Sequence, residues 1–274
     1  MNPASNLAAV PAPREQPLTG CTVVVTRAKA QAGGLAERLE RLGARVLQCP
    51  LIRIERVSDP GPLDDVLDRL EDFDWIAFTS GNAVECFFQR LVERGMSDLA
   101  ARPVSARPSF AVVGAGTAAK LSERGLMPDL VAQTALADSL ATELIELGVR
   151  SQRVLFPRGR IARETLPRKL EEAGAIVESV VVYETLADDA GALPLKRALA
   201  EGAVDIVTFG SASTVESFHA LTSDSGARSY QIVSIGPITT SKAVELGYTV
   251  AATAREHTVD GLIDAIVGAV RQRG

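Results

Sequence analysis

Small residues and hydroxyl-bearing residues recur where an extended apolar run gives way to a helical pattern. Four segments share this character: Thr79-Ser80-Gly81-Asn82, Gly114-Ala115-Gly116-Thr117, Gly210-Ser211-Ala212-Ser213-Thr214 and Gly236-Pro237-Ile238-Thr239. The first turn of a helix exposes backbone N–H groups at the positive end of the helix dipole, which suits a carboxylate or phosphate oxygen. Each segment is therefore a candidate anion site, although such residues also begin many helices simply as N-caps.

Arginines add positive charge close to two further strand ends. Arg27 follows one β-branched run, and Arg158, Gly159 and Arg163 follow a similar run later in the chain. Arginine makes charge-assisted, often bidentate, hydrogen bonds to carboxylates. The candidate ligand-binding residues are Arg27, Ser80, Asn82, Gly114, Thr117, Arg158, Gly159, Arg163, Ser211, Ser213, Gly236 and Thr239.

Several other chemistries find little support in the motifs. The Gly114–Thr117 segment lacks the third glycine of a dinucleotide fingerprint, and no phosphate-binding loop of the GxxxxGK[ST] type occurs. No cysteines, histidines and carboxylates cluster at metal-ligand spacing. Neither Ser80 nor Ser211 has a histidine nearby in the pattern, which argues against a serine nucleophile. We therefore expect a multiply anionic ligand, held without a cofactor or a metal.

The chain contains an internal repeat. Segments that end at Arg27 and Arg158 are 131 positions apart, and segments around Asp74 and Asp205 have the same separation. A third pair follows in the same order at an offset of 122. Such an ordered match predicts that one α/β unit occurs twice through duplication.

Short β-branched runs alternate with helical patterns, which is typical of βαβ units on a parallel sheet. For the first part of the chain we expect strands near 22–26, 45–49, 75–78, 109–113 and 129–131, and helices near 31–42, 63–70, 82–94, 117–124 and 138–147. The fold prediction is α/β, with two flavodoxin-like doubly wound domains. Ligands of such sheets bind beyond the carboxyl ends of the strands.

Two extended stretches complicate a division of the chain near residue 150. Residues 44–57, interrupted by Pro50, and residues 175–186 are both longer than an ordinary strand of about 5–6 residues. Each could begin in one domain and cross to the other, so that the two crossings pair as a β-ladder. This arrangement predicts a disordered extension over 1–17, domain 1 over 18–50 and 188–274, domain 2 over 51–187, and linkers over 51–57 and 181–187.

Tyr183 is the remaining candidate for chemistry. It lies in the second extended stretch, and its counterpart in the first copy falls near Ile52, so the hydroxyl belongs to one copy only. A catalytic group added to a symmetric scaffold would show this asymmetry. A half-buried strand tyrosine with a purely structural role would show it as well, and the residues alone leave both open.

Composition limits the classes of binding partner and the cellular compartment that we expect for this protein. The net charge is −5 without a long basic run, and aromatic residues make up 4%, so we expect no nucleic acid partner. The three cysteines include no CxxC pair, which predicts reduced thiols in a cytoplasmic protein. No apolar run reaches the roughly 18 residues of a membrane span, and the proline-rich start lacks the core of an export signal. We expect a monomer.

Taken in order, the short motifs resemble those of the uroporphyrinogen-III synthase family over nearly the whole chain. The matching pieces are Val25-Thr-Arg27, Phe78-Thr-Ser80 with Asn82-Ala-Val84, Val113-Gly114 with Thr117, Pro157-Arg-Gly159 with Ala162-Arg163, Val182-Tyr-Glu-Thr185, Phe209-Gly-Ser211 with Ser213-Thr214, and Ile235-Gly236 with Thr239. Gly210 and Ala212 depart from the family pattern, which commonly has Thr and Pro there.

The resemblance implies two lobes joined by a two-stranded ladder, with linear hydroxymethylbilane bound between them. It implies closure to uroporphyrinogen III with inversion of the terminal pyrrole and loss of water, without a cofactor. The family's important tyrosine matches Tyr183. The main alternative is a non-catalytic homologue that senses a tetrapyrrole or another anion. A nucleotide-binding flavodoxin-like protein is a third possibility, weakened by the missing phosphate motifs.

Overall fold

The computed structural model describes residues 16–96, 107–134, 136–222 and 229–272. The expected disordered extension over 1–17 therefore falls mostly outside the described residues. Its last two residues, Gln16 and Pro17, open a turn in which the Thr19 N–H donates to the Gln16 carbonyl at 3.1 Å.

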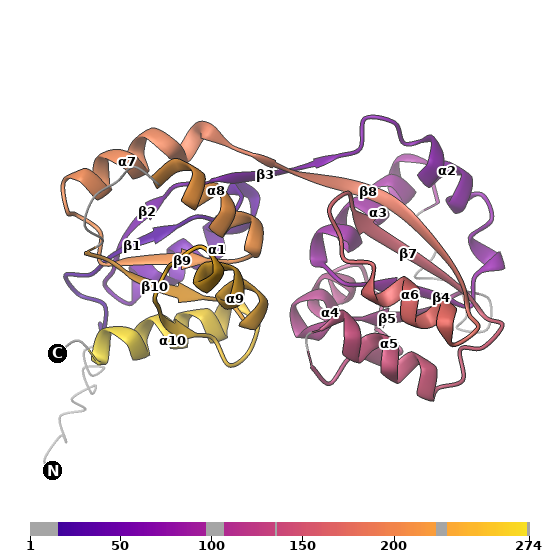
Figure 1. Cartoon of the computed structure of the whole chain (residues 1–274). Helices are drawn as coiled ribbons and strands as arrows, with labels where there is room; N and C mark the ends of the chain where they lie inside the picture. The colour runs from indigo at the N-terminus through magenta and orange to yellow at the C-terminus, as the bar shows by residue number, and fades with distance from the viewer. Residues whose placement is uncertain (1–15, 97–106, 135, 223–228, 273–274) are drawn as a thin grey trace, which may run out of the picture.

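One sheet of five parallel strands takes its strands from both parts of the chain, in the order β11-β10-β9-β1-β2. Its strands are β1 (Thr22–Val25), β2 (Arg45–Gln48), β9 (Ile206–Phe209), β10 (Gln231–Ser234) and β11 (Val250–Thr253). One face is covered by α1 (Lys29–Arg41) and α10 (Val259–Arg271), and the other by α7 (Ala192–Ala200), α8 (Ala212–Thr222) and α9 (Pro237–Glu245). We call this unit lobe 1 (Figure 1).

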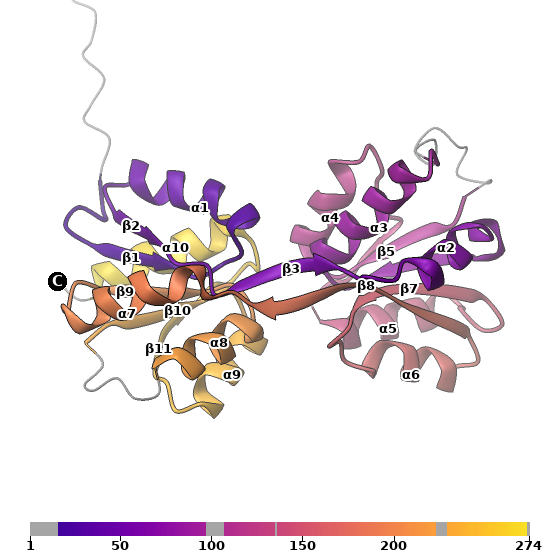
Figure 2. The same cartoon turned by 90° about the horizontal axis from the view of Figure 1, so that it is seen from above.

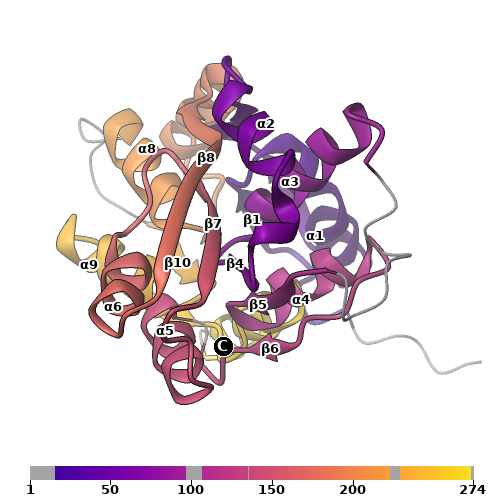
Figure 3. The same ribbon diagram turned by 90° about the vertical axis from the view of Figure 1, so that its right-hand side faces the viewer.

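A second sheet has the order β3-β8-β7-β4-β5-β6. Its strands are β3 (Ile52–Arg56), β4 (Trp75–Phe78), β5 (Ser109–Val112), β6 (Leu130–Val131), β7 (Arg153–Gly159) and β8 (Ile176–Ala187). Helices α2 (Gly61–Leu67), α3 (Gly81–Glu93) and α4 (Gly114–Ser122) cover one face, and α5 (Ala137–Glu146) and α6 (Thr165–Glu172) cover the other. We call this unit lobe 2; Figure 3 views it with β7 and β8 in front. Short 3₁₀ turns occupy Leu70–Asp72 and Asp189–Gly191.

Burial on both faces explains the continuous apolar runs of the strands. In β1, Val23 and Val25 pack toward α1 and α10, whereas Val24 packs toward the helices of the opposite face. A sheet that faced water on one side would show alternating polar residues instead. The sequence-based expectation of an α/β protein built on parallel sheets is confirmed.

The first extended stretch forms two strands that belong to different sheets. Pro50 separates β2, which is parallel to β1, from β3, which is antiparallel to β8. The second stretch is one unbroken strand, because β8 pairs with β7 through its first part and with β3 through its last five residues. The β3–β8 pair runs between the two lobes (Figures 1 and 2).

Helix α4 begins earlier than the pattern predicted. Its first residue is Gly114, three residues before the expected start at Thr117, and Gly114 has a φ of +73°. Glycine adopts this left-handed conformation without steric cost. The Gly114–Thr117 segment is therefore the first turn of the helix, and its backbone N–H groups lie at the carboxyl edge of the sheet of lobe 2.

Candidate functional site

The side chain of Tyr183 meets the start of α3. Its hydroxyl oxygen lies 3.1 Å from the hydroxyl oxygen of Ser80, and Asn82 also hydrogen-bonds the phenol. Ser80 is the N-cap of α3 and accepts a hydrogen bond from the Ala83 N–H at 3.2 Å. The structure therefore brings Tyr183, Ser80 and Asn82 together from two segments that are distant in the chain.

An irregularity between β7 and β8 aims Tyr183 at this point. The register shifts between Arg158 and Gly159, so that Gly159 pairs with Tyr183. A methyl group on Gly159 would lie 2.8 Å from Cζ of Tyr183 and 3.1 Å from Cε2. A bulge of this kind redirects a side chain, and here the phenol ring occupies the space that a larger residue at Gly159 would fill.

Burial raises the pKa of the Tyr183 phenol above its ordinary value, and the hydrogen bonds from Ser80 and Asn82 oppose this rise only in part. Burial acts in this direction because it penalises the charged phenolate. The hydroxyl therefore remains protonated at neutral pH.

Arg27 is the corresponding feature of lobe 1. It follows β1 and packs against Gly210, which follows the neighbouring strand β9; a methyl group on Gly210 would lie 2.9 Å from Cγ of Arg27. Burial lowers the pKa of Arg27 from its ordinary value, but a guanidinium remains charged in proteins. In the described part of the chain no carboxylate forms an ion pair with it. Arg27 is thus a half-buried cation suited to a carboxylate ligand.

The departure at Gly210 has a structural reason. β1 and β9 are adjacent at the point where the strand order reverses, which is where doubly wound sheets bind ligands. Gly210 leaves the space beside this point that the Arg27 side chain fills. The glycine therefore favours the observed position of the arginine, and the backbone donors of the turn remain.

The other two predicted arginines differ from Arg27. Arg158 pairs with Glu164 and donates to the Ala162 carbonyl at 3.2 Å, so it holds the loop after β7. Arg163 lies in that loop, is exposed, and has no ion pair among the described residues. Arg158 therefore organises the loop, whereas the charge of Arg163 is available to a ligand.

The first turn of α8 is capped by its own side chains. The Thr214 N–H donates to the Ser211 hydroxyl at 3.3 Å, and the Ser211 N–H donates to the Thr214 hydroxyl at 3.2 Å. Ser211 and Thr214 therefore act as helix caps, which was the alternative interpretation of these turns. Ser213 lies beside the cap and is partly exposed.

The turns at the starts of α4 and α9 carry no side-chain cap. Gly114 begins α4 and Gly236 precedes α9, so backbone N–H groups of both first turns face outward from the sheet edges. Thr117 and Thr239 are buried at matching positions one turn into each helix. These two turns therefore remain candidate anion sites.

The carboxyl edges of the two sheets approach each other at these turns. A methyl group on Gly116, in the first turn of α4, would lie 3.6 Å from the backbone carbonyl oxygen of His257. His257 follows β11 of lobe 1, and its imidazole lies over Gly236. Figure 1 shows α4 and α9 on the facing sides of the lobes. No sequence motif marks His257, because its neighbours are brought together only by the tertiary structure.

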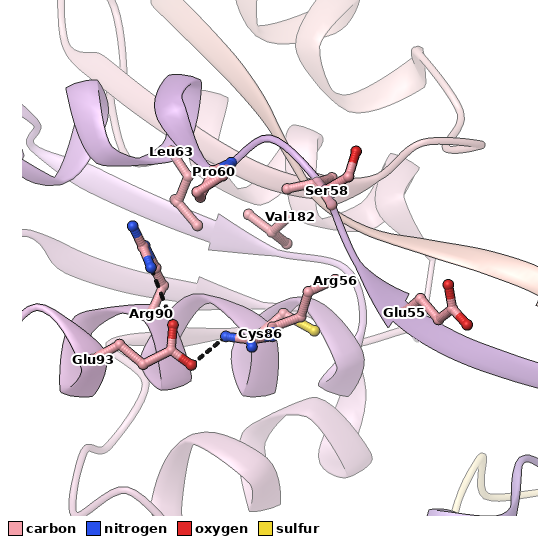
Figure 4. Close-up of a pocket in the computed structure, with 10 residues that line it drawn as sticks. Glu55, Arg56, Ser58, Pro60, Leu63, Cys86, Arg90, Glu93 and Val182 are labelled. Atoms are coloured by element: carbon pink, nitrogen blue, oxygen red, sulfur yellow. Dashed lines mark hydrogen bonds and ion pairs between the residues drawn. The ribbon is translucent and has the colours of Figure 1, made fainter.

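A separate groove of about 410 Å³ opens in lobe 2 between the segment after β3 and helix α3 (Figure 4). Arg56 and Arg90 both pair with Glu93, and Arg90 also pairs with Asp64. Tyr183 does not line it. Because these arginines are already neutralised, the groove is a poor site for an anion.

The described residues offer neither a metal-binding cluster nor a helix suited to span a membrane. In that part of the chain, no group of three or more His, Cys, Asp or Glu side chains is placed to hold a metal ion. None of the helices described is long and apolar enough to cross a membrane.

These features define a two-lobed α/β protein with a candidate anion-binding site between the carboxyl edges of its two sheets. The family model for uroporphyrinogen-III synthase HemD matches residues 34–264. The chain therefore belongs to the uroporphyrinogen-III synthase family.

Individual relatives agree with this assignment. The chain is 36% identical over 273 residues to a uroporphyrinogen-III synthase of Synechococcus elongatus, covering 94% of this chain and 98% of the relative. A putative uroporphyrinogen-III synthase of Methanothermobacter thermautotrophicus is 32% identical over 252 residues, covering 89% and 96%. A mutant uroporphyrinogen III synthase of Thermus thermophilus shares the fold with a TM-score of 0.63 at 22% identity, covering 92% and 99%.

Proposed function

We propose that this chain converts hydroxymethylbilane into uroporphyrinogen III, with inversion of the terminal pyrrole ring and loss of water, as a step of porphyrin biosynthesis. Family membership over residues 34–264 supports the reaction. The observation that carries it to individual residues is the contact between the protonated Tyr183 hydroxyl and Ser80.

In this proposal Tyr183 is the catalytic proton donor. The C–O bond of the terminal hydroxymethyl group breaks, its electron pair stays with oxygen, and the phenol proton converts the departing hydroxide to water. The hydrogen bonds of Ser80 and Asn82 hold the phenol in place and lower the cost of the transient phenolate. For inversion, the terminal pyrrole forms the closing bond through its already substituted α-carbon, that carbon's bond to the neighbouring methylene bridge breaks, and the bridge re-forms at the free α-carbon. Loss of the proton from that carbon restores the phenol.

We propose no cofactor, because the net change is one additional C–C bond and the loss of water, without net oxidation. The substrate's eight carboxylates would be shared between the two lobes. Arg27 and Arg163 supply charge that no carboxylate of the described residues pairs. The uncapped turns of α4 and α9 supply backbone donors, each worth about 0.3–1 kcal/mol at exposed sites. We propose direct substrate contacts for Arg27, Ser80, Asn82, Gly114, Thr117, Arg163, Ser213, Gly236 and Thr239. Of the other residues that the sequence predicted, Arg158 positions the loop after β7, Gly159 the Tyr183 ring and Ser211 the first turn of α8.

The work of the protein is then mainly positioning. Hydroxymethylbilane also cyclises unaided, and that closure proceeds without inversion. Two lobes that hold both ends of the substrate would favour the inverted closure by restricting how the end rings meet. Movement of the lobes toward each other would exclude water from the reacting carbon.

We propose further that the two lobes derive from an internal duplication. Asp74 Oδ2 accepts from the Arg153 N–H at 2.8 Å, and Asp205 Oδ2 accepts from the Thr22 N–H at 2.9 Å. Donors and acceptors are both 131 positions apart, so the two contacts are equivalent. These contacts also support the domain division 18–50 with 188–274 against 51–187, with 51–57 and 181–187 as linkers. We propose that the protein acts as a cytoplasmic monomer; Cys21, Cys49 and Cys86 are free thiols, as expected in a reducing compartment.

The experiment is to supply hydroxymethylbilane to the purified protein and to identify the porphyrin isomer by chromatography after oxidation. We expect the type III isomer. Formation of only the spontaneous type I isomer would show that the chain is not a synthase, and tight substrate binding without turnover would support the non-catalytic homologue.

A further inference from the structure

His257 lies where the two lobes meet. It belongs to the segment between β11 and α10, at the carboxyl edge of the sheet of lobe 1. Its backbone carbonyl oxygen would lie 3.6 Å from a methyl group on Gly116 of lobe 2. The residue therefore contacts one lobe while it belongs to the other.

The imidazole lies across the start of α9. A methyl group on Gly236 would lie 2.9 Å from Cδ2 of His257 and 3.1 Å from Nε2. The backbone at Gly236 is extended, with a φ of 176°, which any residue can adopt. Glycine is required there because the imidazole of His257 approaches the backbone closely. His257 thus keeps its ring against the first, uncapped turn of α9.

The imidazole has no hydrogen-bond partner within the described ranges, although the side chain is only partly exposed. The only other histidine differs, because Nδ1 of His219 lies 3.3 Å from the hydroxyl of Tyr248. The hydroxyl of Thr258, beside His257, is already occupied as the N-cap of α10. The imidazole N–H therefore lies between the two lobes without an acceptor among the described residues, and it is available to donate a hydrogen bond to a bound ligand.

We propose that His257 is a further substrate-binding residue, whose imidazole donates a hydrogen bond to a carboxylate of the tetrapyrrole lying between the first turns of α9 and α4. This inference rests on the proposed function. A carboxylate beside Nε2 would also face the open N–H groups of α9, and the first turn of α4 approaches the backbone of the same residue through Gly116. One contact would then bind substrate and favour the observed spacing of the lobes.

The test compares three substitutions with a matched histidine control. His257→Ala removes the ring, His257→Gln retains a donor near the Nε2 position, and His257→Phe retains bulk over Gly236 without a donor. His219→Gln changes the only other histidine, which lies away from the inter-lobe site. Steady-state KM and kcat for hydroxymethylbilane are measured for each, together with the thermal unfolding midpoint.

We expect His257→Ala and His257→Phe to raise KM roughly tenfold or more with kcat changed much less, because a contact made equally in the bound substrate and transition state acts on KM. His257→Gln should restore most of the affinity, and His219→Gln should leave KM unchanged. If His257→Phe restores the KM as completely as His257→Gln, the size of the side chain alone matters, and the inference is overturned. An unchanged KM in His257→Ala would overturn it too.

The wild-type reaction separates this inference from the proposed function. If the wild-type protein forms no type III isomer, the proposed function itself fails. If the wild-type protein turns over and the His257 variants keep its KM, only the role of His257 fails.

Discussion

The phenol ring of Tyr183 lies directly over the backbone of Gly159 in the neighbouring strand. A methyl group on Gly159 would be 3.0 Å from the Tyr183 hydroxyl oxygen and 2.8 Å from Cζ. The same ring reaches Ser80 at the start of α3. Gly159 thus sets the position of the hydroxyl without needing to contact the substrate.

Removing the hydroxyl should slow the reaction far more than it weakens binding. We expect Tyr183→Phe to lower kcat by about 10²- to 10⁴-fold, the usual range for loss of a positioned proton donor, with KM changed little. The measurement is steady-state turnover of hydroxymethylbilane to the type III isomer. Unchanged turnover would remove Tyr183 from the mechanism.

Displacing the ring should have a similar effect while the hydroxyl is kept. We expect Gly159→Ala to lower kcat about tenfold or more, because the added methyl group would overlap the phenol and move it away from Ser80. Gly268→Ala in α10 is the matched control, since a methyl group there meets nothing within 4 Å. If Gly159→Ala keeps both kcat and the unfolding midpoint, the ring position is not set as described.

The pH profile should reflect the protonated phenol. Burial raises the pKa of Tyr183 above its ordinary value of 10.0, so the proton-donating form persists to higher pH. We expect loss of Tyr183-dependent turnover only above about pH 10, and this loss should be absent from the residual activity of Tyr183→Phe. A Tyr183-dependent decline centred below about pH 9 would contradict the prediction.

Substitution by methionine should change the free energy of unfolding in opposite directions at Arg27 and at Arg158. Arg27→Met removes a partly buried charge without an ion-pair partner in the described chain, so the free energy of unfolding should rise by about 1 kcal/mol while KM rises roughly tenfold. Arg158→Met removes the ion pair with Glu164 and the bond to the Ala162 carbonyl, and should lower the unfolding free energy by about 1–2 kcal/mol.

Denaturant unfolding and steady-state kinetics on the two variants provide the comparison. If Arg27→Met destabilises the protein as much as Arg158→Met, Arg27 has an internal structural role and is not held ready for a ligand.

Local patterns predicted much of the fold. Apolar runs and helical periodicity placed most elements within a few residues, because both faces of each sheet are buried. The predicted start of α4 was wrong because glycines usually indicate a loop, whereas Gly114 begins the helix. Pro50 was recognised as an interruption, but the change of partner from β1 to β8 across it depends on pairings with distant strands.

The sequence by itself determined the α/β class, the parallel strands and the turns at which small residues begin helices, since these follow from periodicity and local backbone preference. Only the tertiary structure decided which candidate side chains remain available to bind a ligand. Arg27 and Arg158 occupy equivalent places in the repeat. Arg27 packs against Gly210 with no ion pair to any carboxylate in the described part of the chain, whereas Arg158 binds Glu164. His257 had no motif, and the packing of two lobes places it between Gly116 and Gly236. The physical reason is that charge pairing, burial and close approach depend on residues that meet only after the sheets have formed.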